Sequence, residues 1–301
     1  MIFSVVVPFF NEEPYIEQCA EALLSQDFDK NKYEIIFIDN GSTDGSADML
    51  REFQRIILLR EERKGSCAAR NKGLSIAKGN IIAFTDADCI VCRDWLSRIY
   101  EGMTKYDATI ALGKRFFPPN SSLPLKLFED YENCKLEYLT KKYPEKVTFG
   151  SANDMAIRTA AFKRFGNLVE FPPEMGDAEF VGRCVCGDPC TKVVYLPGMQ
   201  MTHLEVVNAW IWLKKMRDYG RRGGLAKGTH FYGREVKVEG VPNRHIDFKT
   251  RIELYQYCAN MHGYGIIKRI LSFIFLAIGI LFYKFGHLKG RIESLFINKT
   301  P

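Results

Sequence analysis

Short apolar stretches alternate with amphipathic ones over the first 86 residues. Continuous apolar runs bounded by turn residues predict buried strands, whereas apolar residues that recur every three or four positions predict helices. These patterns predict strands at Phe3–Phe10, Tyr33–Asp39, Arg55–Arg60 and Asn80–Asp86, and intervening helices at Pro14–Gln26, Ala47–Gln54 and Cys67–Gly79. The alternation predicts an α/β fold with a mostly parallel central sheet and helices on both faces.

The pattern loosens after Gly113. It predicts helices at Leu123–Lys142, Thr159–Gly166, Asp177–Gly187 and Val206–Gly224, a strand and turn at Lys146–Arg158, and a late strand at Thr191–Pro197. A chain of 301 residues that is 47% hydrophobic can bury a large core. Its length allows one elaborated domain or two smaller ones.

The C-terminal tail carries the whole net charge. Residues 236–301 contain ten Lys or Arg and four Asp or Glu, which accounts for the formal charge of +6. This tail surrounds the apolar run Ile270–Tyr283, whose 14 residues fall short of the roughly 20 that cross a bilayer. We therefore expect a membrane-surface segment and no nucleic-acid partner; a buried helix is the alternative.

The first 13 residues lack the basic region and cleavage site of a signal peptide, which predicts a first strand. Nine irregularly spaced cysteines without an export signal indicate free thiols in a reducing compartment. A zinc site built from Cys89, Cys92, Cys184, Cys186 and Cys190 is the alternative, but these five thiols exceed the four ligands that zinc takes.

Two acids, Asp86 and Asp88, follow the fourth predicted strand. Ligands of such sheets bind outside the carboxyl ends of the strands, which predicts a shared edge for residues 8–13, 39–44 and 86–88. Two carboxylates so close repel each other unless a cation lies between them. Mg²⁺ and Mn²⁺ prefer oxygen ligands and bind substrate phosphates, so the pair predicts a metal that holds a diphosphate.

Four motifs in order over residues 3–210 resemble the family 2 glycosyltransferases, which have the GT-A nucleotide-sugar fold. They are "VVVPFFNEEPYIEQCAEALLSQ", "IIFIDNGSTDGS", "GSCAARNKGLSIAKGNIIAFTDADC" and "GDAEFVGR". The resemblance implies a glycosyltransferase domain at residues 1–235, divided into a nucleotide-binding half (1–113) and an acceptor half (114–235). Residues 236–301 are then the basic, apolar membrane-associating segment.

The resemblance also implies roles for individual residues. The donor-binding residues would be Pro8, Asn11, Glu12, Asp39, Arg70, Asn71 and Asp86, and the metal ligands Asp86, Asp88 and His203. Asp39 would meet the base, typically uracil. The chain has Asn40 where the family usually has a second Asp, which reduces the local charge.

The acceptor side is implied by "GDAEFVGR". Asp177 would be the catalytic base, with Glu179 and Arg183 on the acceptor side. Gly176 replaces the Glu that usually precedes this Asp, which leaves Glu174 and Glu179 as alternative bases. The family's Gln-x-x-Arg-Trp element is missing, so we expect transfer of one or a few sugars rather than processive synthesis.

The resemblance therefore implies a metal-dependent, inverting transferase that uses Mn²⁺ or Mg²⁺. It would move a sugar from a nucleotide donor, typically UDP-linked, to a hydroxyl, and the basic tail suggests a lipid-linked acceptor on the cytoplasmic face of the cell membrane. A non-catalytic binding or scaffold protein is one alternative. A nucleotidyltransferase is another, although the Gly-rich loop of pyrophosphorylases is absent near the first strand.

Overall fold

The computed structural model describes residues 1–144, 147, 150–170, 176–205, 208–228 and 248–297. These residues divide into two compact units. Unit 1 comprises Met1–Phe116, Leu139–Glu170 and Gly176–Glu205, and unit 2 takes its described residues from Phe117–Tyr138 and Val206–Pro301. The grouping differs from the division at residue 235, which rests on motifs and charge and stays a prediction.

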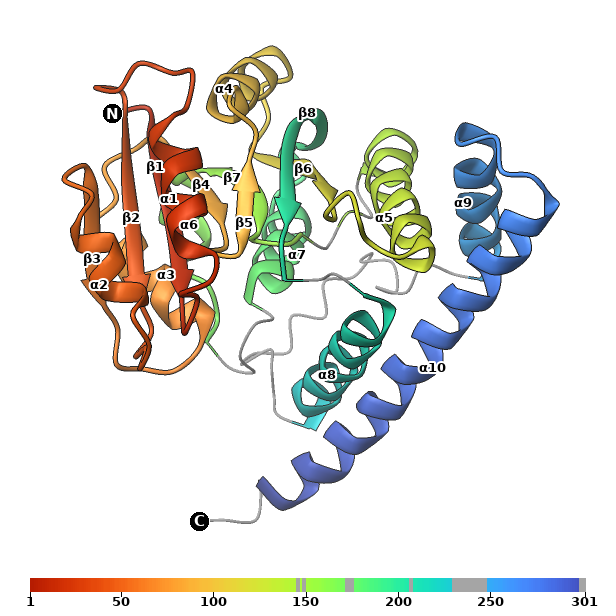
Figure 1. Cartoon of the computed structure of the whole chain (residues 1–301). Helices are drawn as coiled ribbons and strands as arrows, with labels where there is room; N and C mark the ends of the chain where they lie inside the picture. Colours follow the sequence, from red (N-terminus) through yellow and green to blue (C-terminus); the bar gives the residue numbers. More distant parts are fainter. Residues whose placement is uncertain (145–146, 148–149, 171–175, 206–207, 229–247, 298–301) are drawn as a thin grey trace. The chain divides into compact units, whose positions relative to one another are not determined.

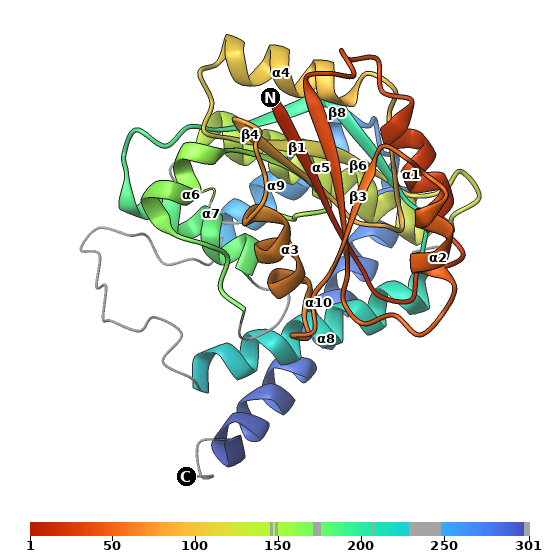
Figure 2. The same ribbon diagram turned by 90° about the vertical axis from the view of Figure 1, so that its left-hand side faces the viewer.

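Unit 1 is built on a mixed sheet of eight strands, which Figures 1 and 2 show from two sides. The four predicted strands are present as β1 (Phe3–Phe9), β2 (Tyr33–Asp39), β3 (Ile56–Arg60) and β4 (Ile81–Thr85), paired in parallel in the order β3-β2-β1-β4. The sheet continues with β7 (Asp154–Arg158), β6 (Ile110–Phe116), β8 (Val193–His203) and β5 (Cys89–Val91).

Parallel pairing does not extend across the whole sheet. Only four of the seven strand pairings are parallel; β7 runs antiparallel to both neighbours, and β5 runs antiparallel to β8. The strands β5 and β6 and the helix α4 (Trp95–Lys105) are absent from the predicted elements. The α/β class is therefore confirmed, and the parallel pairings are the three within β3-β2-β1-β4 and the pairing of β6 with β8.

Helices cover both faces of the sheet (Figure 2). One face packs against α1 (Ile16–Leu24), α2 (Ser46–Arg51) and α4, and the other against α3 (Ser66–Leu74), α6 (Thr159–Phe165) and α7 (Gly176–Gly187). Successive side chains of a strand point to opposite faces of the sheet, so alternating residues pack against the two helical layers. Val5 and Val7 lie in the core beneath α1, whereas Val6 lies so close to α3 that only Gly73 fits opposite it.

Gly79 does not belong to a helix, although the sequence pattern predicts a helix over Cys67–Gly79. Helix α3 ends at Leu74, with Ser75 as its C-terminal cap. A Cβ atom at Gly79 would lie 2.3 Å from the backbone nitrogen of Ser4. The glycine is therefore required by the close approach of this segment to β1.

Unit 2 is helical in its described part. It contains the first part of α5 (Leu123–Lys142), together with α8 (Ala209–Gly228), α9 (Phe248–Met261) and α10 (Ile266–Ile297). Figure 1 shows α8 and α10 side by side, and glycines explain how closely they approach. A Cβ atom at Gly220 or Gly286 would lie within 2 Å of a carbonyl oxygen of the facing helix, so larger residues would separate the two helices.

Helix α10 is longer than the predicted apolar run. It covers 32 residues, because helical structure continues through Lys268 and Arg269 before the run and Lys284 after it. Within Ile266–Glu293, an 18-residue window reaches a mean hydropathy of 2.1, so the helix is long and apolar enough to cross a membrane by length and composition. Whether it crosses a membrane or lies on its surface stays a prediction.

A buried acid lies inside unit 1. Oδ1 of Asp154 accepts a hydrogen bond of 2.8 Å from the indole nitrogen of Trp95, whereas Oδ2 has no partner among the described residues. Burial raises the pKa of Asp154 well above its ordinary value, and the Trp95 hydrogen bond and the charge of Arg115 only partly oppose this. The fold thus favours the protonated acid.

We predict that Asp154→Asn removes a pH dependence of stability. Because its pKa is raised in the folded state, protonation of Asp154 contributes fully to the free energy of unfolding below the unfolded pKa near 4. This contribution decreases by about 1.4 kcal/mol per pH unit as the pH rises, until the pH passes the folded pKa. Urea unfolding between pH 5 and 8 should show the variant gaining stability relative to wild type as pH rises. If the free energies of unfolding of variant and wild type changed in parallel with pH, a protonated Asp154 would be contradicted. The control is Asp107→Asn, which changes an exposed acid.

Candidate active site

The carboxyl ends of β1, β2 and β4 lie at one edge of the sheet, as predicted. Phe9 pairs with Asp39 at the end of the β1–β2 ladder, and the N–H of Asn40 continues the ladder by donating to the carbonyl of Phe9. Strand β4 runs parallel on the other side of β1 and leads directly into Asp86 and Asp88. We call this strand end, with the loops that follow it, the carboxyl edge.

Hydrogen bonds join the loop after β1 to the loop after β2. Asn11 has a φ of 57°, and its Oδ1 accepts a 2.8 Å hydrogen bond from the N–H of Thr43. The N–H of Glu12 donates to Oγ of Ser46 at 2.9 Å, and Pro8 is buried within β1. In the described structure, Asn11 and Pro8 therefore shape the loop, and their contact with a donor stays a prediction.

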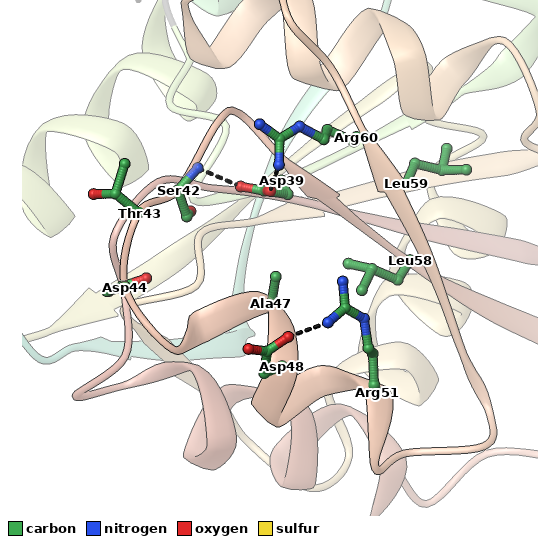
Figure 3. A pocket seen from close by; sticks show the side chains of 10 residues that line it. All are labelled: Asp39, Ser42, Thr43, Asp44, Ala47, Asp48, Arg51, Leu58, Leu59 and Arg60. Atoms are coloured by element: carbon green, nitrogen blue, oxygen red, sulfur yellow. Dashed lines mark hydrogen bonds and ion pairs between the residues drawn. The ribbon is translucent and has the colours of Figure 1, made fainter.

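A shallow pocket of about 440 Å³ opens beside Asp39 (Figure 3). Asp39 is 4% exposed; its Oδ1 accepts from the N–H of Ser42 at 2.7 Å, and its Oδ2 lies 3.6 Å from the guanidinium of Arg60. The side chains of Leu58 and Leu59 form the apolar part of the lining. The pocket therefore combines an oriented carboxylate with an apolar surface.

Asn40 has a structural role that the sequence did not reveal. Its amide nitrogen donates to the carbonyls of Glu61 and Arg63, at 3.0 and 2.7 Å, and its Oδ1 accepts from the N–H of Gly65 at 2.7 Å. A carboxylate cannot donate those two bonds, so an Asp here would face two carbonyl oxygens. Asn40, which stands where the family usually has a second Asp, thus holds the loop 61–65 in place.

A buried arginine faces the first acid of the predicted pair. Arg70, on α3, is 5% exposed, and its Nη2 lies 2.5 Å from Oδ1 of Asp86. Burial acts to lower the pKa of Arg70, but the nearby charges, led by Asp86 and including Asp177, raise it above the ordinary value. The Nε of Arg70 is a buried donor with no partner among the described residues.

The second acid faces a histidine. Oδ2 of Asp88 lies 3.4 Å from Nδ1 of His203, and both side chains are less than 10% exposed. The pairing of Cys89 with His203 between β5 and β8 holds the histidine there. Ligand atoms of Asp88, Cys89 and His203 lie within 4.8 Å of one another. Asp86 bonds to Arg70, so the two acids have different protein partners, and their joint binding of a metal stays a prediction.

This donor set fits a divalent cation. A carboxylate and an imidazole are suitable ligands for Mn²⁺, and the carboxylate also for Mg²⁺. The thiol of Cys89 is the less suitable member, because burial raises its pKa well above the ordinary value and Asp88 adds to the shift. We therefore assign the cation-binding capacity of this cluster to Asp88 and His203.

Asp177 lies in the first turn of α7 and is held by two backbone donors. Its Oδ2 accepts from the N–H of Ala152 at 3.0 Å and its Oδ1 from that of Ala178 at 2.7 Å. Burial raises its pKa, and the charge of Arg70 and these hydrogen bonds only partly oppose the shift. Gly176 explains the missing Glu, because a Cβ atom there would lie 2.3 Å from the carbonyl oxygen of Val169.

The other predicted residues on this side bond to protein groups. Both carboxylate oxygens of Glu179 accept from Arg183, at 3.0 and 2.8 Å, and Arg183 also donates to the carbonyl of Asn167. The amide of Asn71 bonds to both backbone groups of Leu168 and to Glu170. These side chains hold the segment after α6; their contacts with substrates stay predictions, and Glu174 lies outside the described residues.

An eight-stranded α/β sheet with acids at its carboxyl edge, beside a buried arginine and a histidine, defines the GT-A class of fold. Solved structures support this class. TarS 1–349 of S. aureus in complex with UDP-GlcNAc is 16% identical with a TM-score of 0.55, covering 97% of this chain and 92% of that one. The mannosyltransferase PcManGT from Pyrobaculum calidifontis, in complex with GDP-Man and Mn²⁺, is 15% identical with a TM-score of 0.63, covering 99% and 88%.

The family follows from sequence comparison. The profile of "Glycosyl transferase family 2" matches residues 4–166, more than half of the chain, so the chain belongs to this family. Glycosyltransferase AglE of Haloferax volcanii is 34% identical over 140 residues, 44% of this chain and 46% of that protein.

A second relative extends the match further along the chain. It is the poly(ribitol-phosphate) beta-glucosyltransferase of Bacillus spizizenii, 32% identical over 185 residues, which are 60% of this chain and 28% of that protein. The chain thus spans less than half the length of the curated relatives that it matches first.

Proposed function

We propose that this protein is a metal-dependent, inverting glycosyltransferase that moves a sugar from a UDP-sugar to an acceptor hydroxyl. The observation that carries the proposal is the grouping at one edge of the sheet: Asp88 with His203, and Arg70 with Asp86 and within electrostatic reach of Asp177. A cation site, an anion-binding guanidinium and a basic carboxylate are the groups that transfer from a nucleotide diphosphate requires.

The donor would lie along the carboxyl edge with its base in the pocket beside Asp39. The carboxylate of Asp39, oriented by Ser42, can accept the imide N–H of uracil, and the leucine side chains of the pocket offer an apolar contact to the ring. The guanidinium of Arg70, next to Asp86, would supply positive charge near the diphosphate. Two structural neighbours bind UDP-GlcNAc and GDP-Man, which supports a nucleotide-sugar donor.

Asp88 and His203, with Asp86 alongside, would hold Mn²⁺ or Mg²⁺. When bound, the cation supplies positive charge that offsets the charge developing on the departing diphosphate. Asp177 removes the proton of the acceptor hydroxyl as its oxygen attacks the anomeric carbon, and the bond from that carbon to the diphosphate oxygen breaks on the opposite face. The raised pKa of Asp177 makes it a stronger base than an ordinary aspartate.

We predict that Asp177→Asn lowers kcat at least about 100-fold and leaves the dissociation constant of the donor within about threefold, because a general base contributes roughly 10²–10⁴. In the wild type, activity should fall on acidification at a pH above the usual range of Asp, since the base must be deprotonated and its pKa is raised. Transfer and donor hydrolysis measured from pH 4 to 8 test this. Loss of activity in Glu179→Gln but not in Asp177→Asn would assign the base to Glu179.

We predict that Asp88→Asn abolishes the effect of Mn²⁺ on donor binding. In the wild type, Mn²⁺ with UDP-GlcNAc or UDP-glucose should raise the melting temperature more than either does alone, because ligands of the folded state stabilise it. The donor dissociation constant of Asp88→Asn should rise about tenfold or more, which corresponds to ~1.4 kcal/mol. Asp107→Asn is the control; an unchanged Mn²⁺ effect in Asp88→Asn would refute the metal site, and stabilisation by GDP-mannose alone would refute a UDP-sugar.

The acceptor is proposed to be presented at the cytoplasmic face of the cell membrane, on a lipid or a polymer. Within unit 2, α10 has two distinct faces. Its glycines face α8, and the opposite face carries the exposed apolar residues Ile270, Ile274, Leu281, Phe285, Leu288 and Ile292. Each of these six side chains is at least 49% exposed, which in water would be a large unfavourable apolar surface.

Helix α8 adds positive charge to this helix pair. It contributes the exposed Trp210 and six basic residues, Lys214, Lys215, Arg217, Arg221, Arg222 and Lys227. Aromatic and basic residues beside an apolar helix favour an anionic lipid surface. The length of Ile266–Glu293 is also sufficient for a crossing, and both forms of attachment place unit 2 at the membrane.

We predict that Leu281→Asp with Phe285→Asp lowers sedimentation with anionic vesicles several-fold. These side chains are 64% and 68% exposed, so charges at these positions should oppose lipid contact without disturbing the packing on α8. Tyr106→Asp, at an exposed tyrosine of unit 1, is the matched control. Equal sedimentation of the double variant and wild type would contradict membrane contact through α10.

A further inference from the structure

Unit 2 contains a cluster of metal-ligating side chains that the transfer reaction does not use. Ligand atoms of Cys134, Cys258 and His262 lie within 4.8 Å of one another. Oδ1 of Asp130 lies 3.5 Å from Nδ1 of His262. The cluster thus offers two sulfurs and one imidazole close together, with the carboxylate of Asp130 next to the imidazole.

The spacing of these residues along α5 and α9 is regular. Asp130 and Cys134 are four residues apart on α5, so both point to the same side of that helix. Cys258 and His262 are also four apart, and the N–H of His262 bonds to the carbonyl of Cys258 at 3.1 Å, which continues the helical turn beyond Met261. Each helix therefore presents two ligands from consecutive turns.

The surroundings hold the cluster in place. The ring of Tyr138 contacts that of Tyr257, and its hydroxyl donates to Glu253 at 2.8 Å, which joins α5 to α9. After His262, Gly263 has a φ of 58°, and the N–H of Tyr264 returns to the carbonyl of Ala259. This C-terminal cap fixes the position of His262.

We propose that Asp130, Cys134, Cys258 and His262 form a tetrahedral Zn²⁺ site that joins α9 to α5. Zinc takes four ligands from thiolate, imidazole and carboxylate, at about 2.0–2.3 Å. Cys134, Cys258 and His262 already lie within 4.8 Å of one another, and Asp130, beside His262, would move in to supply the fourth ligand. The hydroxyl of Tyr264 donates to Oδ2 of Asp130 and would orient the carboxylate, as groups around zinc sites do.

Burial and charge agree with this assignment. Cys134 and Cys258 are 4% and 2% exposed, whereas the side chains of His262 and Asp130 are 37% and 27% exposed, so the cluster opens to solvent on the side of the latter two. Zinc binds the thiolate form of cysteine, so its positive charge would favour deprotonation of the two buried thiols.

A disulfide between the two thiols is the competing interpretation. It would account for the closeness of Cys134 and Cys258 but not for the presence of His262 within 4.8 Å of both thiols, with Asp130 beside it. The tests below therefore include the oxidised pair as an outcome that overturns the zinc site.

The first test measures metal content. The full chain, purified in detergent and dialysed against Zn²⁺, should retain about one more zinc per chain than Cys134→Ser or His262→Ala under the same treatment. Cys190→Ser, at an exposed cysteine, is the matched control and should retain the wild-type amount. Asp88→Asn, which removes a carboxylate at the carboxyl edge, should also keep this zinc. Equal zinc in wild type and Cys134→Ser would overturn the proposal.

The second test uses the wild type alone, so it does not depend on the folding of variants. Zn²⁺ should protect Cys134 and Cys258 from alkylation at least tenfold, as read by mass spectrometry, and a chelator should remove the protection. Co²⁺ should give the charge-transfer absorption of thiolate ligands, and Zn²⁺ should displace it. Alkylation that is indifferent to Zn²⁺, or a disulfide that joins the two cysteines in protein without added oxidant, would overturn the site.

Discussion

The buried guanidinium of Arg70 is the group on which the carboxyl edge depends. Parallel strands bring acids to one edge, where their mutual repulsion and desolvation oppose folding. Arg70 contacts Asp86 at 2.5 Å and interacts with Asp177, so one cation from α3 partly neutralises acids that follow β4 and begin α7. Removing one partner of a buried pair typically costs about 3–5 kcal/mol; the partial exposure of Asp86 lowers this figure.

Neutral amides complete the support of this edge. Asn40 bonds to the loop 61–65 and Asn71 to the segment 168–170, and each uses both its donor and its acceptor on buried backbone groups. Arg63 then joins the two segments through its bidentate pair with Glu170. The polar groups around Arg70 are thus held by hydrogen bonds whose geometry a charged or smaller residue would not reproduce.

Unit 2 is held together by close helix packing rather than by a buried charge. Helices α8 and α10 approach through glycines, which leaves the apolar residues of α10 on the opposite face, and α5 meets α9 through aromatic rings and the Cys134–Cys258–His262 cluster. A helical unit with so much exposed apolar surface is poorly suited to water. Close packing and a zinc site would both act within the unit, and a membrane would cover its apolar face.

The sequence alone determined the elements with the clearest hydrophobic period. Strands β1 to β4 and helix α5 were predicted within one or two residues, and the location of Asp86 and Asp88 after β4 followed from strand order. The short strand β5 was not predicted, and neither was the antiparallel pairing of β7, because these pairings join residues more than 40 positions apart. Local patterns contain no information about such partners.

Only the tertiary structure decided how the site residues are paired. The sequence predicts that Asp86 and Asp88 bind one metal ion, which stays a prediction; the fold adds a partner for each acid, Arg70 for Asp86 and His203 for Asp88. The same holds for Asn40, whose partners lie 21 to 25 residues away, and for Cys134 and Cys258, which are separated by 124 positions. The sequence determines which groups are available and where strands end, whereas side-chain direction and long-range contact arise only when the helices pack on the sheet and on one another.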